Sequence, residues 1–512
     1  MTIADPAMTI SAPALRLLLS AACFLTGTLC ARDARSQDAA GVFAAFEQSV
    51  VETVSRSEKS VVAIARIPLR NERIDRQPAR NPFGQPIDAN NDPLSPAFAP
   101  QDFGAGILMS APNKPETRLV LTNYHVVHGG RPFVNDGTVV SNARLTVRID
   151  QTRAAWATIF AADPRSDLAV LAIEDRELSA ALQERPTLAL PESVEPRKGQ
   201  FVLTIGNPYA IARDGSPSVS FGMICNVARV PLVNASSEDK TIHQFGMLLH
   251  VDTRLGPGTS GGALLDSSGQ LIGITTSLAA LEGYESSVGF AVPLNAGMRR
   301  IIEDLLQGYE VEYGFLGVQP GDPFAGRFGR AKVRRTQGVP VFKVVPGSPA
   351  DRAGLRSGET IRAVNGVRLF SSDDLFREVG LLAPGSNAHL HVISRDGQRF
   401  VDVRIAKWPV PDAERIVTSN YRQSAWRGLR VDWPTGRMKF FDYDAAYPIA
   451  VVVKTVEVGS PAEAAGLRPG DLITRVANRT IETPDEFSSA VKSLRGNVRL
   501  NLTEGRTVTI QP

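Results

Sequence analysis

Cysteine is scarce in this sequence, which has only three cysteines among 512 residues. Cys23 and Cys30 lie within or at the end of an apolar N-terminal segment, so that only Cys225 would remain if this segment were removed. A single cysteine cannot form an intramolecular disulfide, and no group of cysteines and histidines has the spacing of a zinc site. We therefore predict a protein without disulfides, bound metal ions or other cofactors.

A strong excess of charge of one sign is also absent. The 56 basic and 53 acidic residues leave a formal net charge of +3. Such a balance does not produce the basic surface that is typical of nucleic-acid-binding proteins. The sequence also lacks a P-loop and a clear dinucleotide-binding fingerprint. We therefore expect neither nucleic acid nor a nucleotide as a partner.

Long apolar runs are missing except near the N-terminus. There Arg16 precedes an apolar stretch from Leu17 to Leu29, which is flanked by small residues and ends near Ala31. A run of this length is typical of the core of a signal peptide and is short for a membrane-spanning helix. We predict a signal peptide over residues 1–31 and an exported protein of the periplasm or cell envelope. The alternative is that the segment is retained as a membrane anchor.

The remaining composition is that of an ordinary globular protein, with 43% hydrophobic and 21% charged residues. Apolar residues at helical spacing predict a helix over residues 39–57, whereas the polar and proline-rich residues 71–101 predict a flexible loop. From residue 104 to 292, short β-rich runs alternate with turns, which is the pattern of an all-β barrel or sandwich. A further helix is predicted over 294–306, so that the first domain would span residues 39–310.

The C-terminal part contains an internal repeat. The segments GSPA and AGL at residues 347–350 and 353–355 recur with the same offset at 459–462 and 465–467. The period is longer than the roughly 20–50 residues of solenoid repeats, so the repeat indicates two duplicated domains. We place these domains at residues 311–408 and 425–512, joined by a linker at 409–424.

Ser260 lies in a glycine-rich turn, GPGTSGG at residues 256–262, directly before an apolar run. Acyl transfer requires a nucleophile and free backbone N–H groups that stabilise the developing oxyanion, and glycines make the necessary close approach possible. We therefore predict Ser260 as the nucleophile and the N–H groups of Gly258 and Ser260 as the oxyanion hole. The alternative is an ordinary glycine-rich hairpin.

A serine hydroxyl is a weak nucleophile unless a base accepts its proton. His125 follows an apolar strand and is the candidate base. Asp167 directly precedes the apolar run 168–171. A buried aspartate there would be destabilising unless it were paired, so Asp167 is the candidate that orients the imidazole. Asp163, which precedes a proline, is the alternative. The order His125, Asp167, Ser260 is that of chymotrypsin-like proteases.

Taken together, these segments resemble the HtrA (DegP-like) family of trypsin-like serine proteases. The matching pieces occur in the family's order and span most of residues 42–306: GAG at 104–106, LTNYHVV at 121–127, DPRSDLAVL at 163–171, IGNP at 205–208, the Ser260 turn, and VGFAVP at 288–293. The sequence departs from the family at Thr259, where the family usually has asparagine, and at residues 252–255. These departures leave the geometry of the oxyanion loop open.

The resemblance implies a mainly β fold, with a chymotrypsin-like double β-barrel protease domain and the active site between the barrels. His125 and Asp167 would belong to the first barrel and Ser260 to the second. The strand with Ile274, Thr275 and Thr276 would line the primary specificity pocket. Because these residues are neutral, we expect small or medium aliphatic residues before the cleaved bond.

The two repeated domains resemble PDZ domains, which have an α+β fold and bind extended C-terminal peptides at a sheet edge. In the first copy, the resemblance assigns the carboxylate-binding loop and the start of the binding strand to Gly314, Phe315, Leu316 and Gly317. In the second copy it assigns the same role to Gly428 and Leu429.

The sequence thus predicts an ATP-independent serine endopeptidase that cleaves unfolded or damaged proteins in envelope quality control. Its PDZ domains would bind substrate C-termini or activating peptides, and the chain would form a homo-oligomer, a trimer or a multiple of one. Phe43 and Phe46 would lie at the trimer contact or pack on their own barrel. The alternative function is a non-hydrolytic chaperone or peptide-binding scaffold with a protease-like domain. An intermediate possibility is a latent protease whose loops 210–220 and 279–287 become ordered when a peptide binds.

Overall fold

The computed structural model describes residues 41–68, 102–128, 133–135, 138–140, 143–150, 152–207, 216–228, 247–256, 258–276, 289–321, 338–410, 413–438, 442 and 444–512. The predicted signal peptide at 1–31 and the predicted flexible loop at 71–101 lie outside the described residues, as do loop residues 210–215 and 279–287. Among the described helices, none combines the length and the apolar character that crossing a membrane requires.

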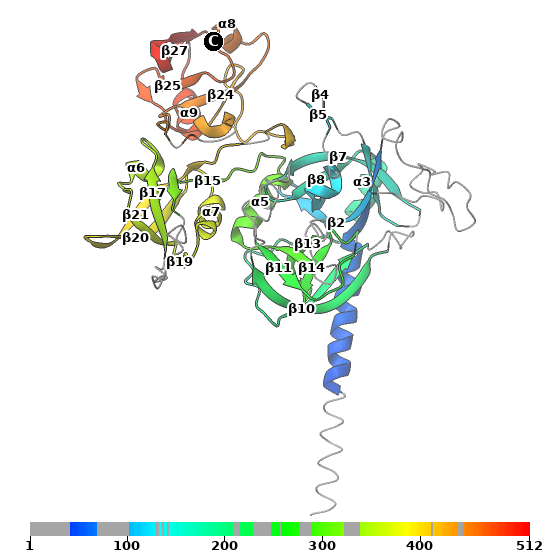
Figure 1. Cartoon of the computed structure of the whole chain (residues 1–512). Helices are drawn as coiled ribbons and strands as arrows, with labels where there is room; N and C mark the ends of the chain where they lie inside the picture. Colours follow the sequence, from blue (N-terminus) through cyan, green and yellow to red (C-terminus); the bar gives the residue numbers. More distant parts are fainter. Residues whose placement is uncertain are drawn as a thin grey trace, which may run out of the picture.

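The first domain is built from two closed antiparallel β-barrels (Figure 1). The first barrel has the order β1-β2-β3-β8-β7-β6, with β1 (Val61–Pro68), β2 (Asp102–Ala111), β3 (Lys114–Asn123), β6 (Ala143–Arg148), β7 (Ala154–Asp163) and β8 (Leu168–Ile173). The second has the order β10-β11-β14-β13-β12-β9, with β9 (Phe201–Gly206), β10 (Ser218–Ala228), β11 (Leu248–Val251), β12 (Ala263–Asp266), β13 (Leu271–Thr276) and β14 (Gly289–Pro293). The predicted double barrel is confirmed.

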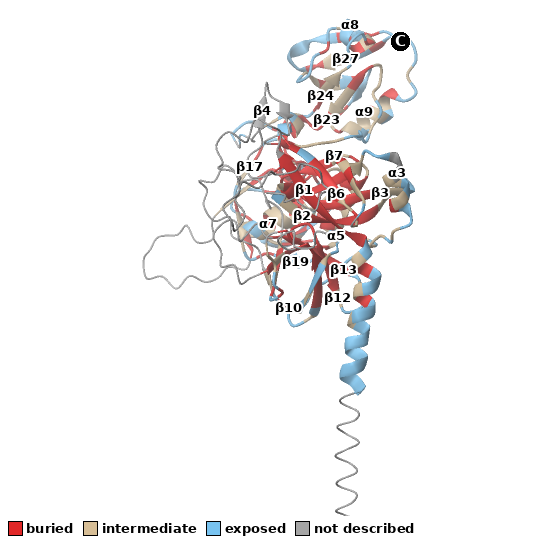
Figure 2. Cartoon of the chain, turned by 90° about the vertical axis from the view of Figure 1, so that its right-hand side faces the viewer, coloured by how far each residue is buried: buried red, intermediate tan, exposed pale blue. Residues whose placement is uncertain are grey.

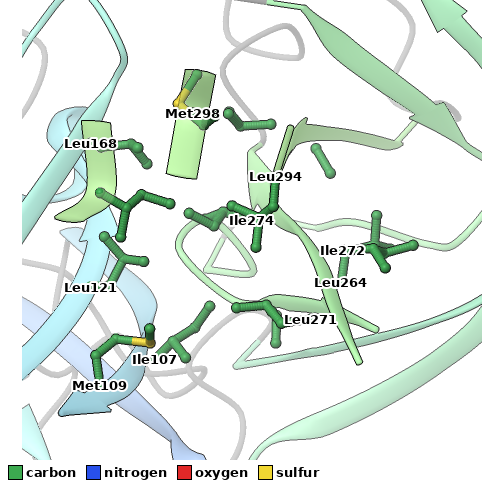
Figure 3. Packing of buried hydrophobic residues seen from close by; sticks show 14 of the residues in the cluster. Ile107, Met109, Leu121, Leu168, Leu264, Leu271, Ile272, Ile274, Leu294 and Met298 are labelled. Carbon is green, nitrogen blue, oxygen red and sulfur yellow. The ribbon is translucent and has the colours of Figure 1, made fainter. Parts of the chain in front are cut away.

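A hydrophobic core shared by both barrels fixes their relative position. Figure 3 shows Ile107, Leu121 and Leu168 of the first barrel near Leu264 and Ile274 of the second. Strand β8 explains how one apolar run serves two cores, because successive side chains of a strand point to opposite faces. Leu168 and Val170 belong to the shared core, whereas the two residues that alternate with them fill the first barrel.

Short helices complete the domain at the ends of the barrels. They are η1 (Glu58–Ser60), α2 (Tyr124–His128), α3 (Arg176–Gln183) and α5 (Ala296–Leu306), and a hairpin of β4 (Phe133–Asn135) and β5 (Thr138–Val140) follows α2. The side chain of Asn295 caps α5 by accepting a hydrogen bond from the Met298 amide at 2.9 Å. Residues 41–57 form the predicted N-terminal helix, most of which is exposed and projects beyond the second barrel (Figures 1 and 2).

Two smaller domains with the same order of elements follow. The first has β16 (Val318–Pro320), β17 (Val339–Val344), α6 (Pro349–Arg352), β18 (Thr360–Val364), β19 (Val367–Arg368), α7 (Ser372–Gly380), β20 (Asn387–Ser394) and β21 (Gly397–Arg404). The second has β23 (Leu429–Asp432), η5 (Pro434–Arg437), β24 (Val451–Val456), α8 (Pro461–Ala464), β25 (Leu472–Val476), β26 (Arg479–Thr480), α9 (Pro484–Val491), β27 (Val498–Leu502), η6 (Thr503–Gly505) and β28 (Thr507–Ile510). Short strands β15 (Gly314–Phe315) and β22 (Ala406–Lys407) pair beside the first, and η4 (Ala413–Arg415) lies between the two domains.

The repeated GSPA segments have the same local role in both copies. Ser348 accepts a hydrogen bond from the Asp351 amide, and Ser460 accepts one from the Glu463 amide, so each serine caps a short helix that proline begins. The repeat therefore has a structural role in both copies, because it caps and begins these helices.

Buried charges join the three domains. The Lys407 ammonium group, which is fully buried, lies 2.8 Å from carboxylate oxygens of Glu310 and of Asp432. Burial by itself would lower the pKa of Lys407, but Asp432, Glu310 and Glu312 raise it above its ordinary value. Because an unpaired buried charge is very unfavourable, these carboxylates hold the domain junction together.

Candidate active site

His125 and Asp167 form a close pair at one end of the first barrel. Strand β3 ends at Asn123, and the short helix α2 then places the His125 ring beside the turn between β7 and β8. Nδ1 of His125 lies 2.9 Å and 3.0 Å from the two carboxylate oxygens of Asp167. The backbone amide of His125 also donates to Asp167 at 3.0 Å. The carboxylate of Asp167 is fully buried, whereas the side chain of His125 is 12% exposed.

The conformation of Asp167 is held by its neighbours. Its φ angle of 56° lies in the left-handed region, which costs a residue with a side chain about 1 kcal/mol or more. Its carbonyl accepts hydrogen bonds from the Tyr124 amide at 2.9 Å and from the Asn123 side chain at 3.0 Å. The residues on either side of the α2 boundary therefore fix the turn that carries the carboxylate.

Asp163, the alternative acid, has different partners. Its carboxylate accepts hydrogen bonds from Arg165 at 2.7 Å, from the Ser166 amide at 3.0 Å and from the Tyr313 hydroxyl at 2.6 Å. Asp163 is fully buried and anchors the turn that leads to Asp167, whereas Asp167 is the aspartate in contact with His125. No local pattern could indicate the Tyr313 contact, because 150 positions separate the two residues.

The Ser260 turn is tightly packed against the ends of strands from both barrels. Gly258 and Gly261 have φ angles of 94° and 84°, which favour glycine. A Cβ atom on Gly258 would lie 2.4 Å from the Asn207 carbonyl oxygen, and one on Gly261 would lie 2.1 Å from that of Ala105. The Ala105 amide donates to the Ser260 carbonyl at 2.7 Å. The serine of the second barrel is thereby tied to β2 of the first.

Gly104 lies between the two halves of the site. A Cβ atom there would be 2.6 Å from the Val126 side chain and 3.1 Å from the Ser260 carbonyl oxygen. Val126 follows His125 in α2, so the backbone at Gly104 is in contact with both the histidine helix and the serine turn. The structure thus pairs His125 with Asp167 and places the helix that carries His125 and the turn that carries Ser260 against the same glycine, at the boundary between the barrels.

Thr259, where the sequence departs from the family, closes the serine turn. Its hydroxyl donates to the Gly256 carbonyl at 2.7 Å, and its own carbonyl accepts a hydrogen bond from the Thr275 hydroxyl at 2.5 Å. Ile274 packs in the shared core (Figure 3). Thr276 is also buried. The assignment of Ile274, Thr275 and Thr276 to a specificity pocket stays a prediction.

The predicted peptide-binding loops occupy equivalent places in the two smaller domains. A Cβ atom on Gly317 would lie 2.2 Å from the Ser348 side chain, and one on Gly428 would lie 2.1 Å from the Ser460 side chain. Leu316 and Leu429 are buried beside these glycines. Gly314 and Phe315 pair with β22, and Phe315 stacks on Tyr447. Peptide binding at these residues also stays a prediction.

His128 makes folding sensitive to acid. Burial, together with the nearby cations Arg415 and Arg66, lowers the pKa of His128 from its ordinary 6.5 to about 4. Between pH 6.5 and about pH 4, His128 is protonated in the unfolded chain but neutral in the folded protein. The free energy of unfolding is therefore highest above pH 6.5 and decreases as the pH falls below this value. The free energy of unfolding should decrease by about 2 kcal/mol from this group between pH 7 and pH 5.

Urea unfolding of the wild type and of His128→Phe at both pH values measures this effect. Phenylalanine keeps a ring against Tyr124, on which His128 stacks at 4.1 Å between centroids. The substitution should remove about 2 kcal/mol of the pH dependence. An unchanged pH dependence would show that His128 does not titrate as described.

Comparisons with known proteins place the chain in a family. The family model of the trypsin-like peptidase domain matches residues 104–274, and that of the PDZ domain matches residues 341–392 and 452–503. A probable periplasmic serine endoprotease DegP-like of Chlamydia muridarum is 30% identical over 409 residues, which cover 79% of this chain and 73% of the relative. A protein of the same name from Ectopseudomonas mendocina is 29% identical over 83% of this chain and 80% of its own.

A solved HtrA-type protease, AlgW with a decapeptide, is 23% identical and has a TM-score of 0.45, over 71% of this chain and 99% of the solved one. Sequence identity, coverage and the order of the three domains agree with the resemblance seen in the sequence. The chain belongs to the HtrA (DegP-like) family of serine endoproteases, with a trypsin-like protease domain followed by two PDZ domains.

Proposed function

We propose that this protein cleaves peptide bonds with Ser260 as nucleophile, His125 as general base and acid, and Asp167 as the residue that orients His125. The observation that carries this proposal is the His125–Asp167 pair at 2.9 Å, next to a glycine-rich turn that holds Ser260. A buried carboxylate on Nδ1 leaves Nε2 of the histidine unprotonated and ready to accept a proton.

The proposed reaction has two steps. The Ser260 hydroxyl attacks the substrate carbonyl while His125 accepts its proton, and the resulting oxyanion is stabilised by the N–H groups of Gly258 and Ser260. His125 then donates the proton to the leaving amine, which gives an acyl-enzyme and releases the C-terminal fragment. Water, deprotonated by His125, hydrolyses the ester and regenerates the serine. Asp167 stabilises the imidazolium in both steps.

The proposed substrates are unfolded or damaged proteins in the periplasm or cell envelope. Relatives over most of the chain are named periplasmic endoproteases, and the two PDZ domains suit the capture of exposed C-termini. We propose that hydrolysis needs no nucleotide and prefers bonds that follow small or medium aliphatic residues. We also propose that residues 1–31 are a signal peptide that is cleaved off on export. The alternative is that this segment is retained as a membrane anchor.

Digestion of casein without added nucleotide tests the proposed function. The full chain should degrade casein, and mass spectrometry of the fragments should place the cuts after aliphatic residues. Degradation that appears only when a C-terminal peptide is added would show a latent protease that peptide binding activates, and would also support the proposal. If casein stays intact under both conditions while the protein suppresses aggregation of unfolded substrates, the chaperone alternative replaces this proposal.

We also propose that the chain assembles into a homotrimer, or a multiple of one, through an aromatic cluster on the second barrel. Phe46 of the N-terminal helix lies 6.0 Å and 5.8 Å from Phe201 and Phe221, measured between ring centroids. Although the three rings touch, they remain 38%, 48% and 47% exposed, and Phe43 is 73% exposed. Exposed apolar surface of this kind marks a protein interface.

A charge in this cluster should break the assembly. Phe221→Glu should convert a trimer into a monomer, because a carboxylate would be buried in an apolar interface. Sedimentation measures the change in mass. Phe400→Glu on β21 is the matched control, since Phe400 is 65% exposed and lies away from the cluster, and it should leave the mass unaltered. A trimer that persists in Phe221→Glu would contradict the proposed interface.

A further inference from the structure

The segment between the two PDZ domains is attached to the protease domain. We name residues 413–424 the docked linker. Ala162 of β7 and Val417 exchange two backbone hydrogen bonds of 3.0 Å each, so the docked linker pairs with the strand that leads to the Asp167 turn. The Ser419 hydroxyl donates to the Phe160 carbonyl at 2.6 Å. A simple spacer between domains would not require such contacts.

Further contacts fix the docked linker to the end of α5. The Asn420 side chain donates to the Gln307 carbonyl at 2.7 Å, and Arg422 forms a 2.6 Å ion pair with Asp304. The docked linker is thus bonded to the protease domain at two places, at β7 and at the end of α5.

Arg415 reaches from the docked linker to the helix that carries His125. Arg415 is only 8% exposed. Its Nε atom donates to the Tyr124 hydroxyl at 3.4 Å, and its guanidinium lies 5.5 Å from the centre of the Tyr124 ring. The same ring stacks on His128 at 4.1 Å between centroids. Burial of a guanidinium is costly, so a residue of this type indicates a specific role for the contact.

Tyr124 connects this contact to the catalytic pair. It directly precedes His125, it is 1% exposed, and its backbone amide donates to the Asp167 carbonyl at 2.9 Å. A shift of Tyr124 would therefore displace both His125 and the Asp167 turn. Misplacement of a catalytic group by about 1 Å can reduce a rate by a factor on the order of 100.

We infer that Arg415 is a positioning residue for His125, and that the docked linker makes the geometry of the catalytic pair depend on the segment between the PDZ domains. This inference deepens the proposed function and rests on the proposed roles of His125 and Asp167. It assigns to the docked linker a part in catalysis that neither its composition nor the family resemblance indicates.

The other end of the docked linker contacts the second PDZ domain. Gln423 donates to Asp485 at the start of α9 at 2.8 Å, and Tyr421 lies under the Arg430 guanidinium at 4.3 Å. A cavity of about 380 Å³ is lined both by the docked linker and by Leu429 of the predicted peptide-binding strand. An extended peptide on β23 would thus lie against the segment that positions His125.

Kinetics of full-length variants test the inference. We would measure kcat and KM for fluorescein-labelled casein, with active sites counted by a fluorophosphonate, and the melting temperature of each variant. Arg415→Ala should lower kcat per titrated site about tenfold with KM within about twofold of wild type, because binding surfaces are untouched. Arg415→Lys, which keeps a cation over the ring, should recover part of the rate. Arg437→Ala, the loss of an exposed arginine outside the docked linker, should keep wild-type kinetics.

A double-substitution cycle identifies the route through Tyr124. Tyr124→Phe should lower kcat, and adding Arg415→Ala should cause less than its own separate loss, since both changes remove the hydrogen bond between Arg415 and the Tyr124 hydroxyl. Effects that multiply, or wild-type kcat per titrated site in Arg415→Ala, would overturn the inference even if that variant melts at a lower temperature. Tyr124→Phe keeps the ring, so it remains informative if Arg415→Ala does not fold. Failure of the wild-type protein to cleave casein both with and without an added C-terminal peptide would instead reject the proposed function.

Discussion

Replacement of Ser260 by alanine should lower kcat for peptide-bond hydrolysis by a factor on the order of 10⁶. The hydroxyl oxygen of Ser260 is the atom that becomes acylated, and no other side chain at the barrel boundary is proposed to replace it. Casein hydrolysis per folded molecule, followed over hours, measures the loss. The fold should be retained, because backbone hydrogen bonds of Gly261, Gly262 and Thr259 hold the turn and do not depend on the identity of residue 260.

The control for this variant is the binding of substrate. Ser260→Ala should still bind casein, since the substitution removes one oxygen atom and leaves the PDZ domains unchanged. Hydrolysis by the variant at more than a few per cent of the wild-type rate would show that Ser260 is not the nucleophile.

Replacement of Asp167 by asparagine should lower kcat by a factor on the order of 10⁴. An amide group in place of the carboxylate can donate to Nδ1 of His125, which would leave the proton on the nitrogen that faces the serine. It would also remove the negative charge that stabilises the imidazolium. The asparagine can still accept the hydrogen bond from the His125 amide, so the local backbone should persist.

Asp163→Asn is the matched comparison. Asp163 forms a buried 2.7 Å pair with Arg165 and does not touch His125, so its loss should mainly lower stability, by about 3 kcal/mol or more. The melting temperature and kcat of both variants separate the two roles. Loss of activity without loss of stability in Asp163→Asn, together with an active Asp167→Asn, would reverse the assignment of the two aspartates.

The sequence was sufficient for those features that depend on local patterns. The β-rich runs predicted an all-β barrel or sandwich, because strands leave a recognisable alternation of apolar runs and turns, and the family resemblance added the double barrel that the structure has. Each of the three predicted catalytic residues follows or precedes an apolar strand, and the sequence around it is typical of its catalytic role. These residues are His125, Asp167 and Ser260. The structure accordingly places His125 and Asp167 in contact and ties the Ser260 turn to the first barrel.

Contacts between distant segments could not be predicted in this way. The hydrogen bond from Arg415 to Tyr124 joins residues 291 positions apart, and that from Tyr313 to Asp163 joins residues 150 positions apart. The docked linker is bonded to β7 largely through backbone groups, which every residue possesses, so its composition resembles that of an ordinary linker. Ile274 likewise needed the barrel closure to show that it faces the shared core.

The central claim is that His125 and Asp167 activate Ser260, and covalent labelling tests it most directly. After treatment with a fluorophosphonate, mass spectrometry of the digested protein should find the adduct on Ser260, approaching one per chain, and should find almost none in His125→Ala. The account would be contradicted if Ser260 of the folded wild-type protein stayed unmodified even after a C-terminal peptide was added. An adduct on a different serine would contradict it as well.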